Sequence, residues 1–165
     1  MTIHFVDGSS IDSASGLGSN AGDILQTTSI STLTSDHSTS SNGSYSDTGL
    51  SASITPSATS SKVIVIAVLD FEGIGDRDRR LMTSIHRGNV QSSTQLARAH
   101  GGQYRTGGDN SISHGSHTFW YLDSPSTTSS TTYKVGLMSL DGSTVKLLGS
   151  SSTNRTYMYL QEVKG

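Results

Sequence analysis

Apolar and polar residues alternate in short runs along this chain from residue 24 onward, and clusters of turn-forming residues separate the runs. In the segment 132–137 every second residue is apolar (Tyr133, Val135 and Leu137), which is the period of a strand with one buried face. No stretch keeps the helical i, i+3, i+4, i+7 spacing for more than about two turns. The candidate strands are 24–34, 50–54, 62–69, 80–86, 91–97, 117–122, 132–139, 144–148 and 156–163.

This spacing of strands predicts the fold class. About eight or nine short strands with no helix and no internal repeat predict an all-β, jelly-roll-like antiparallel β-sandwich. The strongest hairpin signal is Asp141-Gly142, because that dipeptide accepts the positive φ of a tight type I′ turn. In the last candidate strand, Tyr157 and Tyr159 lie on one face, and the opposite face is also apolar. That strand is therefore predicted to be central in its sheet, or packed against another subunit.

The first 22 residues differ from the rest. Turn formers occupy nearly every position of the segment 8–22, which cannot form a core of its own. The apolar residues before it (Ile3, Phe5 and Val6) are suited to add as a strand to a neighbouring protein. We therefore divide the chain into an extended N-terminal anchoring arm, 1–22, and a β-sandwich domain, 23–165. A disordered leader is the alternative interpretation of the arm.

Composition adds that the surface is rich in hydroxyl groups. The 165 residues include 33 Ser and 20 Thr, against 11 Lys+Arg and 13 Asp+Glu. Such a surface is typical of an outward-facing module, such as an adhesin, a coat or a fibre, rather than of an ordinary cytosolic enzyme. The apolar fraction of 32% is low for a domain that must build its core alone, which favours association into a closed trimer or dimer.

Charge and segment lengths exclude several partners. The formal net charge of −2 provides no basic footprint, so nucleic acid is not an expected partner. No apolar run approaches the length needed to span a membrane. The first residues show neither the basic nor the hydrophobic part of a signal peptide, and there is no Cys for a disulfide framework. A surface protein made in the host cytoplasm and displayed on a virus particle fits these features.

Three patterns in the sequence bear on catalysis or metal binding, and none supports an enzyme. His114 and His117 are three residues apart and would point to opposite faces of a strand, so no metal site is predicted. The triplet Asp47-Thr48-Gly49 matches that of aspartic proteases, but their chemistry needs two such carboxylates and the chain has one copy. We interpret it as a turn entering the strand at Leu50. No G-x-S-x-G motif occurs, and no cofactor is predicted.

Two groups of residues are candidate subunit contacts. Arg77, Arg79 and Arg80 belong to the only dense charge cluster, where an exposed solvated loop is the alternative to a contact in which Arg pairs bidentately. Tyr157 and Tyr159 form the second group.

An aromatic run supplies a candidate carbohydrate site. Trp120 and Tyr121, with Tyr104, are candidate glycan-binding residues, because sugar-binding surfaces place aromatic faces beside polar groups. The alternative is a strand whose alternate residues fill a core or a subunit interface.

Four segments carry a resemblance to a known group of proteins. The segment 47–65 resembles one that is common in structural proteins of tailed bacteriophages, especially aquatic ones. Three shorter stretches are similar to the same group: 22–26, 122–126 running on to 132–135, and 159–163. The resemblance covers about residues 22–165 and implies a module of tail fibres or capsid surfaces, usually trimeric. It marks no functional residues.

These observations lead to two functional hypotheses. The first is a non-enzymatic virion surface protein, a capsid decoration, cement or short head-fibre protein whose arm binds another virion protein such as the major capsid protein. The second is a tail fibre or receptor-binding tip that contacts tail proteins and binds host surface glycans. The chain has no shaft repeat and no coiled-coil heptads, which favours the first.

Overall fold

The computed structural model describes residues 3–4, 10–11, 20–74, 79–103, 112–149 and 156–165. The secondary-structure elements in these residues are all β-strands. The strands are β1 (Ile3–His4), β2 (Ser10–Ile11), β3 (Ile24–Thr27), β4 (Ser31–Thr32), β5 (His37–Thr39), β6 (Ser46–Ile54), β7 (Lys62–Ile74), β8 (Arg79–Arg87), β9 (Thr94–Gln103), β10 (Ile112–Asp123), β11 (Thr131–Ser139), β12 (Val145–Leu147) and β13 (Tyr157–Val163).

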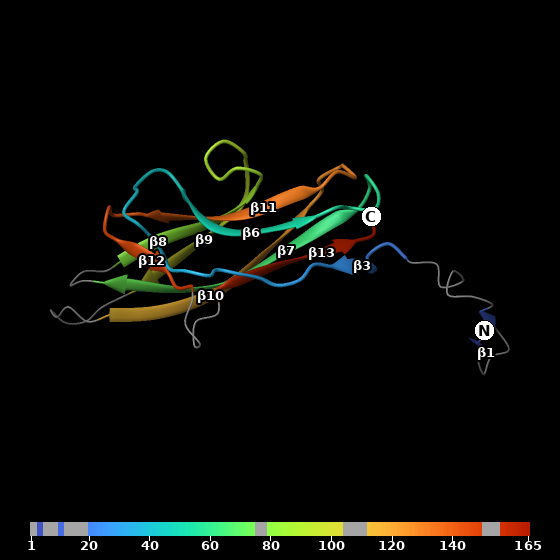
Figure 1. The fold of residues 1–165 in the computed structure, drawn as a ribbon, viewed down its shortest axis with the longest axis horizontal. Helices are drawn as coiled ribbons and strands as arrows, with labels where there is room; N and C mark the ends of the chain where they lie inside the picture. The colour runs from blue at the N-terminus through green and yellow to red at the C-terminus, as the bar shows by residue number, and fades with distance from the viewer. Residues whose placement is uncertain (1–2, 5–9, 12–19, 75–78, 104–111, 150–155) are drawn as a thin grey trace.

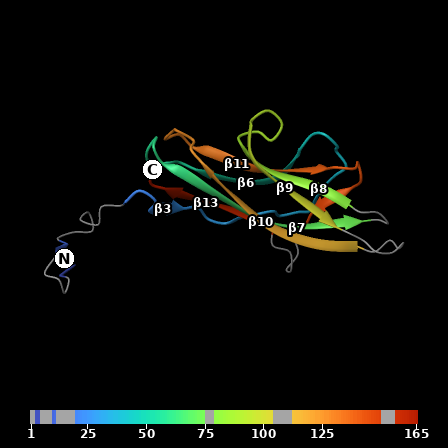
Figure 2. The same cartoon turned by 180° about the vertical axis from the view of Figure 1, so that it is seen from behind.

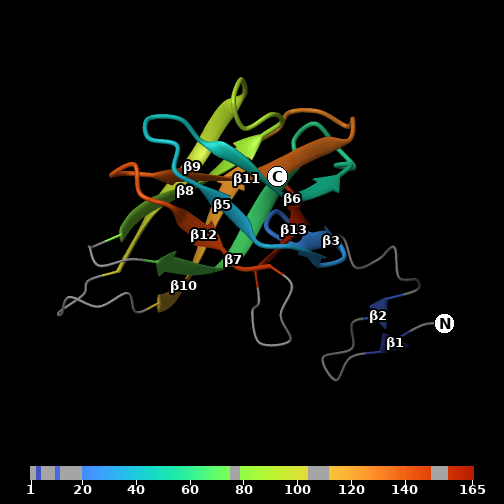
Figure 3. The same ribbon diagram turned by 60° about the vertical axis from the view of Figure 1, so that its left-hand side comes forward.

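The sandwich consists of two antiparallel sheets that face each other (Figures 1 and 3). The β8 sheet has the order β6-β11-β8-β9. The β7 sheet is built around the long strand β7, which pairs with β10 along one edge. On the other edge β13 pairs with residues 62–68 of β7, and β12 pairs with residues 71–73. Beyond them, β3 and β4 pair with β13, and β5 pairs with β12.

The path of the chain between the sheets is that of a jelly roll. It crosses from one sheet to the other after β5, β6, β7, β9, β10 and β11. Among the described strands of the sandwich, only β8 and β9 are both consecutive and hydrogen-bonded to each other. Strands from distant parts of the chain therefore lie side by side, as the view from behind also shows (Figure 2). The predicted all-β, jelly-roll-like sandwich is confirmed.

The core lies between the sheets and is filled by alternate residues of the strands. β7 alone buries five apolar side chains, and β11 buries the Tyr133, Val135 and Leu137 face that the sequence predicted. Burial of such side chains contributes about 1.5–3 kcal/mol each. The central position predicted for the last strand is also confirmed, since β13 lies between β7 on one side and β3 and β4 on the other.

Two predictions about turns are wrong. Gly142 has the positive φ expected of it (77°), but β11 and β12 belong to different sheets, so Asp141-Gly142 forms a corner and not a hairpin. Asp47-Thr48-Gly49 is not a turn before a strand. It lies inside β6, where the register with β11 shifts, and forms a bulge with Gly49 at φ 82°.

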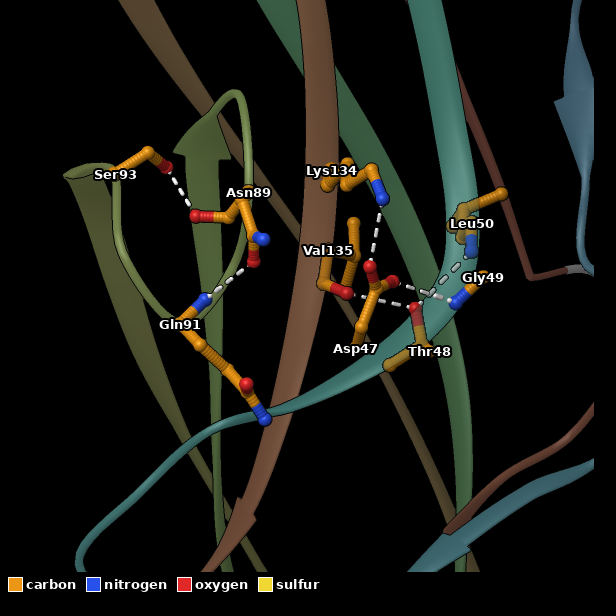
Figure 4. A network of polar contacts seen from close by, with 9 residues as sticks. All are labelled: Asp47, Thr48, Gly49, Leu50, Asn89, Gln91, Ser93, Lys134 and Val135. Atoms are coloured by element: carbon orange, nitrogen blue, oxygen red, sulfur yellow. Dashed lines mark hydrogen bonds and ion pairs between the residues drawn. The ribbon is translucent and has the colours of Figure 1, made fainter.

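Side chains of the bulge hold it against β11. Asp47 Oδ2 lies 2.7 Å from Lys134 Nζ, and Asp47 Oδ1 accepts a hydrogen bond from the backbone N–H of Gly49 (Figure 4). The Thr48 hydroxyl donates a hydrogen bond to the carbonyl of Val135. At the bulge, Val135 has no single partner residue on β6.

A buried carboxylate links β13 to two neighbouring segments of the sandwich. Glu162 on β13 has no exposed surface, and its oxygens accept hydrogen bonds from Ser57 N–H and Oγ–H and from Gln26 Nε2. Burial by itself would raise the pKa of Glu162, but these bonds and one from Ser61 outweigh it and lower the pKa to about 2. The carboxylate thereby ties β3 and the β6–β7 loop to β13.

Candidate interaction surface

The outer face of the β7 sheet is the candidate functional site. Residues directly opposite each other in antiparallel strands share a face, so the strand register defines rows across the sheet. The three rows that cross β10, β7 and β13 are Trp120–Ile66–Tyr159, Leu122–Ile64–Gln161 and Thr118–Val68–Tyr157. We call these nine residues the apolar face.

The apolar face exists because β7 is apolar on both sides. Val63, Val65 and Ala67 point into the core, while Ile64, Ile66 and Val68 alternate with them and point outward. An unbroken apolar run is typical of a strand that is covered on both faces, yet the outward side chains of this part of β7 stay partly exposed. The three outward side chains are only half-buried.

Exposure is largest on β10, the edge strand of this sheet. Trp120 is 67% exposed and Leu122 is 42% exposed. The other large hydrophobic side chains that are exposed in the described residues are Ile24, Leu25 and Ile30, which lie on β3 or between β3 and β4 in the same sheet. Exposed apolar groups gathered on one sheet, with no charged side chain among the nine residues, are typical of a contact surface.

Charged side chains lie together at the other end of the same sheet. Lys146 Nζ is 2.9 Å from Glu72 Oε1 and 3.7 Å from Asp36 Oδ2, and the hydrogen bond with Glu72 raises the pKa of Lys146. His114 Nδ1 is 4.0 Å from Glu72 Oε2. A hollow of about 280 Å³ beside them is lined by Asp70, His114, Gly115, Ser116 and Leu148. The charged groups of these four side chains pair with one another, and none of the four residues belongs to the apolar face.

Of the residues predicted from the sequence, the structure brings three together. Tyr157 and Tyr159, which were predicted as subunit contacts, share the apolar face with Trp120, which was predicted as a glycan-binding residue. Tyr121 points to the opposite side of β10 and packs against the core, so it shares no surface with Trp120. Tyr104 lies outside the described residues.

The arginine cluster and the arm are described only in part. Arg80 is exposed on β8, in the other sheet, and Arg79 begins that strand, while Arg77 lies outside the described residues. In the arm, Ile3 of β1 pairs with Ile11 of β2, and this pair joins no other described strand. Phe5 and Val6 lie outside the described residues.

Sequence reasoning missed six members of the apolar face: Ile64, Ile66, Val68, Thr118, Leu122 and Gln161. The unbroken run from residue 63 to residue 69 was a usable signal, because an exposed face would require polar alternation. The run could not indicate which strands lie beside it, so the row that joins Trp120 to Tyr159 was not predictable.

The histidines are separated as strand geometry requires. His114 lies on the outer face of β10, while His117 points inward, where its Nε2 is 2.9 Å from Thr83 Oγ1. Burial lowers the pKa of His117. Among the described residues, no three His, Cys, Asp or Glu side chains are grouped so that they could hold a metal ion. The described residues also contain no helix long and apolar enough to cross a membrane.

The strand order defines the class of protein, a jelly-roll β-sandwich. No protein family and no curated protein sequence matches the chain. Among solved structures, it is similar to the Eiger TNF of S. frugiperda, with 8% identity and a TM-score of 0.37 over 79% of this chain and 93% of that one.

Two further solved structures with similarity come from infectious bursal disease virus. The VP2 subviral particle shows 13% identity and a TM-score of 0.42 over 86% of this chain. The Gx strain structure shows 12% identity and a TM-score of 0.39 over 87% of this chain. In both cases the match spans 38% of the viral chain.

Proposed function

We propose that this chain is a non-enzymatic structural module of a virus particle that associates through its apolar face with further copies of itself. The observation that carries the proposal is the 67% exposed Trp120, lying in an uncharged row with Ile66 and Tyr159. A soluble monomer rarely leaves such a surface open, whereas an oligomer buries it.

A second copy is the occupant that the surface chemistry supports. The nine residues of the apolar face carry no charge, so two such faces meet without like-charge repulsion or desolvation of an unpaired ion. The rest of the chain is rich in Ser and Thr, which suits the surfaces that stay in contact with water. A homotrimer is the closed arrangement that we favour, following the resemblance to bacteriophage structural proteins.

The oligomer can be tested in solution by sedimentation velocity of the full chain over a range of concentrations. Trp120→Ser should weaken self-association by at least about tenfold, because a large aromatic group at the centre of an interface contributes more than about 1.4 kcal/mol. Arg98→Ser, which truncates an exposed side chain on β9 in the other sheet, is the control and should leave association unchanged. A wild-type chain that stays monomeric at all concentrations would refute self-association.

We further propose that the module decorates the capsid, with the arm as its attachment to another virion protein. Immunogold microscopy of intact particles with antibody against residues 23–165 tests this. Label over the head supports a decoration, cement or short head-fibre protein. Label at the tail end supports the alternative, a tail fibre or receptor-binding tip, and absence of label from every particle refutes the virion assignment.

A further inference from the structure

The outer face of the β8 sheet, on the opposite side of the molecule, carries a pocket that none of the preceding arguments uses. Two of the residues that line it, Tyr45 and Val90, lie over Gly136 of β11, where the absence of a side chain lets neighbouring groups come close. A Cβ atom at this position would lie 2.7 Å from Ser84 Oγ, 2.8 Å from Val90 Cγ1 and 3.1 Å from Tyr45 Cβ. Val90 and Tyr45 therefore pack down over the sheet at this glycine.

The loop between β8 and β9 forms one wall of the pocket. Val90 at its tip is only 3% exposed, although it belongs to a surface loop. Asn89 organises the loop, because its Oδ1 accepts a hydrogen bond from Gln91 N–H and its backbone carbonyl accepts one from the Ser93 hydroxyl (Figure 4). The same carbonyl also accepts from Ser93 N–H. Gly88 N–H donates to Thr132 O, which fixes the base of the loop on β11. The wall is thus held in place by backbone contacts at both ends.

The cavity between this loop and the segment that leads into β6 has a volume of about 580 Å³. Sites for small molecules usually fall between about 300 and 1,000 Å³. The residues that line it are Gly43, Ser44, Tyr45, His86, Val90, Gln91, Ser93 and Gln95. Hydroxyl, amide, phenol and imidazole groups dominate this set, and none of its members is an acid, a lysine or an arginine.

Two polar groups of the pocket residues lack hydrogen-bond partners. His86 is 3% exposed, and its Nε2 lies 2.7 Å from Ser84 Oγ while its Nδ1 has no partner. The rings of Tyr45 and His86 pack edge to face, with their centroids 5.4 Å apart. The Tyr45 hydroxyl lies near Ser84 and Gln95 but makes no hydrogen bond of standard geometry. Buried polar groups without partners are uncommon in folded proteins and call for an explanation.

Burial favours the neutral form of the imidazole in this pocket. Burial lowers the pKa of His86, and the nearby charge of Asp47 opposes that shift only in part. A neutral imidazole has one donor and one acceptor nitrogen, so only half of its hydrogen-bonding capacity is used by Ser84. Arg98, whose charge acts on Tyr45, and Asp47, whose charge acts on His86, are of opposite sign and together add no net charge beside the pocket.

From these features we infer that the pocket binds a neutral saccharide residue. Each sugar hydroxyl both donates and accepts, which matches a lining of Gln, Ser, Tyr and neutral His side chains. The Tyr45 ring and Val90 supply apolar surface for the C–H side of a sugar ring. A phosphate or carboxylate ligand is usually bound by Arg or Lys, which the lining lacks. A metal ion would need several imidazole, carboxylate or thiolate ligands, and the lining holds one, His86. The lining is also too polar for a hydrocarbon.

The test uses the full chain and four probes, which are glucose, galactose, mannose and N-acetylglucosamine. Saturation-transfer NMR detects binding of each sugar, and spectra of the protein record the Tyr and His ring signals. At least one should bind and shift the ring signals of Tyr45 and His86. Gln91→Ala and Gln95→Ala each remove one amide from an exposed position and should weaken that binding by about fivefold or more. Thermal unfolding should show that both variants are folded.

Trp120→Ala is the matched control, because it removes an exposed aromatic group from the opposite sheet and should leave sugar binding unchanged. Loss of binding in Trp120→Ala with retention in both glutamine variants would place the sugar on the apolar face and overturn the proposal. Failure of all four sugars, or binding of inorganic phosphate at Tyr45 and His86, would also overturn it. None of these outcomes depends on whether the chain self-associates.

Discussion

Replacing Glu162 by Gln should lower the free energy of unfolding of the sandwich. The carboxylate accepts hydrogen bonds from Ser57 and Gln26, and it has no contact with solvent. In Glu162→Gln an NH₂ group takes the place of one acceptor oxygen. It then faces an N–H or O–H donor, and two donors cannot form a hydrogen bond with each other. The folded state then keeps at least one buried donor without a partner, while the unfolded state gains nothing.

The pKa of Glu162 sets the size of the effect. The carboxyl group has an ordinary pKa of 4.5 and a folded-state pKa of about 2. At about 1.4 kcal/mol per pH unit, this difference corresponds to about 3 kcal/mol. Because the folded pKa is the lower one, the contribution is fully present above pH 4.5 and is lost as the pH falls towards 2. Glu162→Gln should therefore lose about 3 kcal/mol at pH 7 and progressively less at lower pH.

Urea unfolding followed by circular dichroism at several pH values between 7 and 2.5 measures this difference. Wild type and variant must be compared at one protein concentration, because self-association also adds stability. Arg98→Ser, at an exposed position of β9 in the other sheet, is the control and should change stability little at any pH. A gap between wild type and Glu162→Gln that stays constant down to pH 2.5 would refute the reasoning.

Two further substitutions test the interior. Tyr133→Phe removes the 2.7 Å hydrogen bond to the buried carboxylate of Asp123 and should cost about 2 kcal/mol in urea unfolding, although Arg87 still lies 3.5 Å from that carboxylate. A cost below about 0.5 kcal/mol would contradict this. Gly115→Ala should cost about 1–3 kcal/mol, because its Cβ would lie 2.7 Å from two carbons of the Phe71 ring, whereas Ser116→Ala, on the exposed side of β10, should be close to neutral in the same assay.

The local pattern of the sequence determined the class of fold and the orientation of many side chains. The alternation at residues 132–137 fixed which side of β11 is buried, because a strand turns successive side chains to opposite faces. The same rule separated His114 from His117. The apolar character of the last strand on both faces also indicated its central place in the sheet. These properties depend only on residues close together in the chain.

Local signals failed where the outcome depended on where the next strand lies. Asp141-Gly142 has the backbone conformation that the dipeptide favours, but whether it forms a hairpin or a corner depends on which sheet receives β12. Asp47-Thr48-Gly49 is a bulge because β11 passes beside it, and a turn motif carries no information about that partner. The segment 24–34 is split into two short strands along β13.

Tertiary structure alone created both proposed sites. The apolar face joins residues from positions 64–68, 118–122 and 157–161, which only the register of β10, β7 and β13 aligns. The pocket at His86 forms because Gly136 of β11 lets Val90 and Tyr45 approach from two separate segments. The sequence supplied the chemistry of each group, its hydroxyls, amides and apolar side chains. Long-range strand pairing decided which groups meet, because in a jelly roll nearly every neighbour in space is distant in the chain.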